Sequence, residues 1–83
     1  MKDKVIVIFD NARDKNVVDI EIPLDITAKE MIAGLNQAYA LGINTESLQE
    51  CHMQSENPIA LLRGNKTMQE FGIRDGSIIH FTE

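Results

Sequence analysis

One long helical pattern, begun by Thr27, sets the architecture of this chain. Thr27 is followed three residues later by Glu30, the spacing of a capping box in which each side chain bonds the other residue's backbone N–H. Apolar residues then recur at three- and four-residue intervals, at Ala28, Met31, Ile32, Leu35, Ala38 and Tyr39. Gly42 stands where a left-handed residue would end the helix. A helix with one apolar stripe needs one apolar surface to cover it.

The residues before the helix predict that surface. Val5–Phe9 is a short run rich in β-branched residues. After a polar loop, Val17–Ile22 alternates apolar residues with Asp19 and Glu21, which places one face inward and the other in water. Pro23 ends this segment because it has no N–H for a strand ladder. The two segments predict a β-hairpin.

The residues after the helix predict shorter elements. They are a weak strand at Leu48–Gln54, a strand at Ile59–Leu62, a single 3-10 turn capped by Thr67 and closed by Gly72, a tight turn at Asp75–Gly76 and a last strand at Ser77–Phe81. The whole order is strand, strand, helix, strand, strand, short 3-10 turn, strand. It predicts one α+β domain over residues 1–83, with a mixed sheet packed on one helix. The two most apolar strands, first and last, are expected to pair at the sheet centre.

This order and its spacings resemble the ubiquitin superfamily, whose fold is the β-grasp. The segment from Ile20 to Thr27 resembles the strand, proline and threonine cap that lead into the ubiquitin helix, and Gly42-Ile43 resembles the exit from it. Phe71 to Ile78 resembles the turn and final strand. Such motifs identify a fold and say little about function.

Within the superfamily, the chain is most similar to the YukD/EsaB family, ubiquitin-like proteins associated with bacterial type VII (ESX-like) secretion. The similarity rests on Val5–Asp10, on Leu61-Leu62 before an Asn-containing turn, and on Phe71–Ile78. Ser77 stands where the family tends to have aspartate, and residues 44–56 match weakly and carry an insertion.

Charge and composition narrow the classes of partner. Thirteen acidic and eight basic residues give a net charge of −5, with no basic stripe for nucleic acid. The same sign disfavours anionic membrane surfaces and is compatible with a basic protein. The apolar run after Met1 is too short for a signal peptide or a membrane span. We therefore expect a cytoplasmic protein without direct membrane insertion.

No residue pattern predicts catalysis, a cofactor or a metal. Cys51 and His52 are neighbours on a predicted strand, so their side chains would point to opposite faces and could not share a proton. Two histidines, His52 and His80, without a carboxylate in register make a poor metal site. Ubiquitin and the sulfur carriers act through a Gly-Gly tail, whereas this sequence ends Phe81-Thr82-Glu83. We expect no conjugation, unless a longer precursor supplies the tail.

A candidate protein-binding surface follows from the strand alternation. If Val5, Val7 and Phe9 face the helix, the opposite, open face of the sheet carries the side chains between them. Its predicted members are Ile6, Ile8, His52, Ile78 and His80. An apolar cluster exposed on a small domain usually marks a contact site, and relatives use the same face.

The expected function is that of a non-enzymatic adaptor that docks through this face. By resemblance, its partners would be membrane or ATPase components of a type VII secretion system, and a homodimer is the other use of the surface. Two alternatives remain open: a modifier or sulfur carrier with a missing tail, and an interaction domain of a larger β-grasp assembly.

Overall fold

The computed structural model describes residues 3–47 and 49–82. Its first two strands, β1 (Lys4–Asn11) and β2 (Asn16–Pro23), form the predicted hairpin, with Val7 opposite Ile20. Along β1, buried and more exposed residues alternate as expected for a strand with one covered face. Each strand is longer than its apolar run, because backbone pairing continues into the polar residues beside the loop and to Lys4 and Pro23 at the other end.

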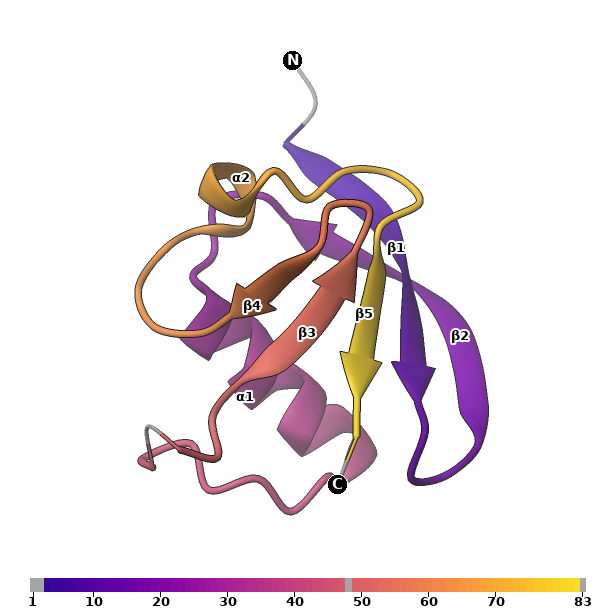
Figure 1. Ribbon diagram of the computed structural model, residues 1–83, viewed down its shortest axis with the longest axis vertical. Coiled ribbons are helices and arrows are strands. Elements are labelled where there is room, and N and C mark those ends of the chain that lie inside the picture. Colours follow the sequence, from indigo (N-terminus) through magenta and orange to yellow (C-terminus); the bar gives the residue numbers. More distant parts are fainter. Residues whose placement is uncertain (1–2, 48, 83) are drawn as a thin grey trace.

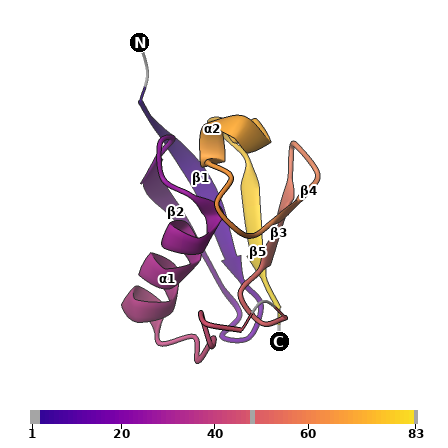
Figure 2. The same cartoon turned by 90° about the vertical axis from the view of Figure 1, so that its left-hand side faces the viewer.

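The described residues form one sheet of five strands in the order β2-β1-β5-β3-β4 (Figure 1). The remaining strands are β3 (Met53–Glu56), β4 (Ala60–Leu62) and β5 (Ile78–Phe81). β1 and β5 are neighbours, as predicted for the first and last strands, and they pair in parallel, while the other neighbours are antiparallel. The helix α1 (Ala28–Tyr39) covers one face of this sheet, and the other face is left open (Figures 1 and 2).

The core lies between α1 and the sheet. It includes side chains from every strand and both helices, among them Val7, Phe9, Ile32, Leu62, Met68 and Ile79, each fully buried. Met31, Met53 and Met68 are all buried as well, so these methionines fill the core and do not form a binding surface.

The two helices begin side by side and cap each other. Besides α1, the chain forms the one-turn helix α2 (Met68–Phe71), and Thr27 and Thr67 meet in an isolated β-bridge. The N–H groups of Ala28 and Lys29 donate to carbonyls of residues 66 and 64, and those of Met68 and Gln69 donate to carbonyls of residues 26 and 24. The third N–H of each helix donates to its own capping threonine. The first three backbone donors of each helix are therefore satisfied within the chain.

The segment after α1 differs from the sequence prediction. The helix ends at Tyr39, because Ala40 adopts the left-handed conformation at φ 52° in place of the predicted Gly42. Turning there brings Leu41 into the core, where it is 3% exposed. The amide side chain of Asn36 then bonds both the N–H and the carbonyl of Ile43, which fixes the exit path.

The predicted strand Leu48–Gln54 is wrong over most of its length. β3 begins only at Met53, and the N–H groups of Glu50 and Cys51 donate to the carbonyl of Ser47 in a turn. Leu48 itself lies outside the described residues. β3 then continues through Ser55 and Glu56, two residues beyond the predicted end at Gln54. The short element after Thr67 is also corrected, since it is a turn of α-helix and not a 3-10 turn.

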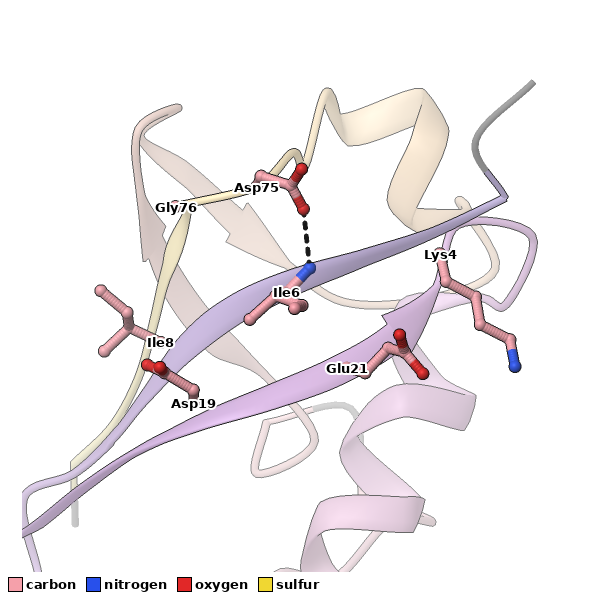
Figure 3. A pocket seen from close by; sticks show the side chains of 7 residues that line it. All are labelled: Lys4, Ile6, Ile8, Asp19, Glu21, Asp75 and Gly76. Carbon is pink, nitrogen blue, oxygen red and sulfur yellow. Dashed lines mark hydrogen bonds between the residues drawn. The ribbon is translucent and has the colours of Figure 1, made fainter.

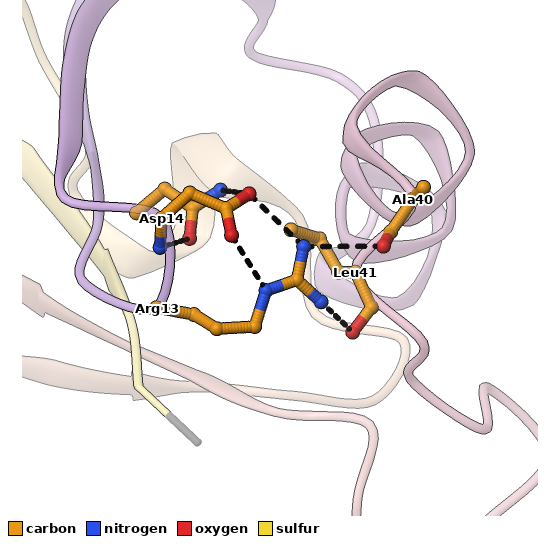
Figure 4. A network of polar contacts seen from close by, with 5 residues as sticks. Arg13, Asp14, Ala40 and Leu41 are labelled. Atoms are coloured by element: carbon orange, nitrogen blue, oxygen red, sulfur yellow. Dashed lines mark hydrogen bonds and ion pairs between the residues drawn. The ribbon is translucent and has the colours of Figure 1, made fainter.

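Arg13 in the β1–β2 loop ties the hairpin to the end of α1 (Figure 4). Its guanidinium donates to the carbonyl of Leu41 at 2.9 Å and to that of Ala40 at 3.2 Å. It also bonds both carboxylate oxygens of Asp14, and it lies 5.7 Å from the centre of the Phe81 ring. A cation is favoured at this position because unpaired carbonyls gather at a helix C-terminus.

A candidate docking surface on the open sheet face

The strand register arranges the open face in two rows. The first row crosses the sheet as Asp19, Ile8, Ile78 and Glu56. The second crosses all five strands as Val17, Asp10, His80, Gln54 and Leu61. Apolar residues therefore lie among carboxylates across the face, and the surface is more acidic than the predicted apolar cluster.

A hollow of about 440 Å³ lies at the β1–β2 side of this face (Figure 3). We call it the acidic hollow. Its lining residues are Lys4, Ile6, Ile8, Asp19, Glu21, Asp75 and Gly76. Ile6 is 52% exposed there, a high value for a large apolar side chain on a central strand. Ile8 is half-buried.

The acidic hollow is built by segments from both ends of the chain. Asp75 precedes β5, and its Oδ1 accepts a hydrogen bond from the backbone N–H of Ile6 at 2.8 Å. The N–H of Gly76 donates to the carbonyl of Ile6 at 3.0 Å. Asp19 and Glu21 come from β2, on the strand positions opposite Ile8 and Ile6. Three carboxylates and one ammonium group thus surround an isoleucine floor.

This combination suits a lysine or arginine side chain. The aliphatic part of such a side chain can lie on Ile6 and Ile8 while its charged end reaches the carboxylates. Within the described residues, Lys4 is the sole cationic member of the lining against Asp19, Glu21 and Asp75. The net negative charge of the lining therefore favours binding of a cationic group over an anionic one.

His80 lies farther along the face, between two carboxylates. Its Nδ1 is 2.9 Å from Oδ2 of Asp10, and its Nε2 is 3.6 Å from Oε1 of Glu56. The prediction that no carboxylate lies in register with a histidine is wrong, because Asp10 is the β1 residue directly opposite His80. Across residues 3–47 and 49–82, no group of three potential ligands has an arrangement that could hold a metal ion.

The five predicted contact residues are not all brought together. Ile6 and Ile8 line the acidic hollow, and Ile78 pairs with Ile8 in the next strand. Ile78 and His80 are half-buried. His52 is exposed, but it precedes β3 and shares only a small hollow of about 160 Å³ with His80, away from the acidic hollow.

The acidic lining was missed by sequence reasoning. Asp19 and Glu21 were placed correctly on the wet side of a strand, but nothing in that pattern connects them to Ile6 and Ile8. Asp75 was assigned only to a turn. The alternation of Asp19 and Glu21 with apolar residues indicates that their side chains face water. It does not indicate which β1 residues lie opposite them, and this register is what places them beside Ile6 and Ile8.

Cys51 lies apart from this surface. It is 6% exposed, and burial raises the pKa of its thiol above the ordinary value. His52 is exposed, so the two neighbouring residues differ in burial although neither belongs to β3. A buried thiol with a raised pKa is a poor nucleophile.

Comparison with known proteins now identifies the family. Residues 4–81 match the model of the family described as "WXG100 protein secretion system (Wss), protein YukD". The chain belongs to the YukD family. No curated protein matches the sequence.

Solved structures show the fold of this YukD-family chain. A protein designed on the basis of ubiquitin is similar at a TM-score of 0.69 and 15% identity, covering 99% of this chain and 90% of the design. The C-terminal ubiquitin-like domain of mouse tubulin-specific chaperone e is similar at a TM-score of 0.72 and 10% identity, covering 93% of this chain and 82% of that domain. The ubiquitin-like domain of Plasmodium falciparum Dsk2 is similar at a TM-score of 0.63 and 18% identity, covering 93% of each chain. The fold is therefore the ubiquitin-like β-grasp. Neither described helix has the length and apolarity to cross a bilayer.

Proposed function

We propose that this protein is a non-enzymatic adaptor of a type VII secretion system and docks a partner protein on its open sheet face. The observation that carries the proposal is the acidic hollow, where the exposed Ile6 lies among three carboxylates and one ammonium group. Membership of the YukD family supplies the secretion context. Ubiquitin-like domains typically act through protein–protein contacts, which supports a binding role.

The chemistry of the face defines the partner. Ile6, Ile8 and Ile78 offer apolar contact, while Asp19 and Glu21 favour cationic groups. A partner segment that presents lysine or arginine beside apolar residues would satisfy both. We propose that the segment belongs to a membrane or ATPase component of the secretion machinery, met from the cytoplasmic side.

The test is a tagged pull-down from a cell that contains the secretion system, followed by protein identification and intact-mass measurement. Wild type is compared with Ile6→Asp and with the double variant Ile8→Asp, Ile78→Asp. Ala33→Asp is the control, because Ala33 is exposed on α1, which covers the opposite face of the sheet. Circular dichroism of each variant checks that the fold is kept.

Support would be recovery of identified secretion components by wild type and Ala33→Asp, with loss of these components in the Ile6 and Ile8 variants. Equal recovery by all folded variants would place the contact elsewhere. A captured form of higher mass would favour the modifier alternative. A dimer in light scattering that Ile6→Asp disrupts would assign the surface to a second copy.

A further inference from the structure

The outer edge of β2 carries a row of backbone groups that the sheet does not use. In an antiparallel pair, opposite residues alternate between bonding each other and pointing their N–H and C=O groups away. The N–H and carbonyl of Ile6 bond Asp75 and Gly76, and the N–H of Ile8 donates to the Ser77 carbonyl. The backbone of both residues is therefore turned from β2 toward β5.

The partners of these residues must then point outward. Glu21 is opposite Ile6 and Asp19 is opposite Ile8, so the N–H and C=O of both are directed to the outer edge of β2. Val17, opposite Asp10, continues the same alternation. β2 is the last strand of the sheet on this side in the part of the chain that the structure describes (Figure 1). Three residues thus offer a regular series of donors and acceptors.

Most features that protect an edge strand are lacking here. β2 has eight residues, it pairs with β1 without a bulge, and it contains no lysine. Its one proline, Pro23, is the terminal residue. Long regular edges of this kind accept additional strands unless charge or shape prevents it.

The charges on this edge discriminate between occupants. Asp19 and Glu21 project onto the open face beside the acidic hollow (Figure 3). If a second copy paired its β2 antiparallel about Asp19, the two Asp19 carboxylates would be directly opposite, which is destabilising. A strand with lysine or arginine at those positions would be attracted instead.

On the helix-facing side of β2, an added strand would meet apolar residues. Val18 and Ile20 pack against the core from the helix side of the sheet, yet both are only half-buried because β2 is an edge strand of the sheet formed by the described residues. An added strand alternates its side chains between the two faces, so basic residues on one side would be interleaved with apolar residues on the other.

We propose that the outer edge of β2 binds an extended segment of a partner protein as a sixth strand, and that this segment alternates basic and apolar residues. Main-chain hydrogen bonds to residues 17, 19 and 21 give the affinity, and the alternation gives the selectivity. The proposal goes beyond docking on the open face and does not require it, because Ile6 and Ile8 take no part in the edge pairing.

The test uses a capped heptapeptide in which lysine alternates with valine, Lys-Val-Lys-Val-Lys-Val-Lys, and a control peptide of the same composition arranged Val-Val-Val-Lys-Lys-Lys-Lys. Backbone amide exchange is followed by NMR on the full chain. The alternating peptide should slow exchange at Val17, Asp19 and Glu21 by about tenfold or more, while the control peptide should not.

Two variants at one position separate the backbone from the charge. Asp19→Pro removes an outward N–H and leaves the β1 ladder intact, whereas Asp19→Ala keeps the N–H and removes only the carboxylate. The peptide should bind Asp19→Pro about tenfold more weakly than Asp19→Ala. Equal affinity for these two variants, or no slowing at the three amides, would overturn the edge proposal. Open-face docking is tested separately by the pull-down of Ile6→Asp, because slowed exchange at these three outward-pointing amides reports edge pairing alone.

Discussion

The mutual capping of the two helices gives a quantitative prediction about stability. Thr27 and Thr67 each accept a hydrogen bond from the N–H of the glutamate three residues later, at 3.1 and 3.2 Å. Replacing a capping threonine by alanine costs about 1 kcal/mol, within a usual range of about 0.5–2. Thr27→Ala and Thr67→Ala should each destabilise the protein by about 1 kcal/mol, which corresponds to a fall of roughly 4–8 °C in Tm.

The structure further predicts that the two effects are not independent. The bridge between Thr27 and Thr67 lets each helix start supply carbonyl acceptors to the other. Fraying of the first turn of one helix therefore weakens the first turn of the other. The second substitution then removes interactions that are already partly lost. The double variant should be less destabilised than the sum of the single variants, by about 0.5 kcal/mol.

Urea unfolding monitored by far-UV circular dichroism measures all three free energies of unfolding. Thr82→Ala serves as the control, since Thr82 is exposed after β5 and caps no helix; it should change stability by less than about 0.5 kcal/mol. Additivity of the two cap substitutions within about 0.3 kcal/mol would refute the mutual-capping argument. So would single effects no larger than the control.

The remaining predictions concern charge. The pKa of Glu30 and of Glu70 is lowered from the ordinary 4.5, chiefly because each carboxylate accepts a hydrogen bond from the backbone N–H of its capping threonine. A lowered folded pKa means stability that is present above the unfolded value and lost as pH falls through the folded one, so the urea midpoint should drop below about pH 4.5. The urea midpoint of the double variant Glu30→Gln, Glu70→Gln should drop less over the same pH range. A pH dependence of the midpoint equal to that of wild type would contradict this. Arg13→Lys should destabilise the protein by about 1 kcal/mol, because an ammonium cannot reproduce the planar fork that bonds two carbonyls at the end of α1; a thermal melt equal to wild type would argue against that role.

Local patterns determined much of this molecule. Alternation along β1 placed Val7 and Phe9 inside and Ile6 outside, because a strand turns successive side chains to opposite faces. The spacing Thr27 to Glu30 located a helix start for a similar reason, since the capping bonds join residues three apart. These features need no knowledge of what lies across the sheet.

Tertiary structure decided what surrounds those residues. Asp75 reaches the N–H of Ile6 across 69 positions of the sequence, and Asp10 meets His80 across 70. Both contacts follow from the parallel register of β1 and β5, and no local pattern specifies how two distant strands align. The end of α1 at Ala40 is decided in the same way, because burial of Leu41 in a core assembled from the whole chain outweighs the preference for glycine at the turn. The sequence alone therefore indicated which side chains face outward, while the strand register made an acidic hollow out of them.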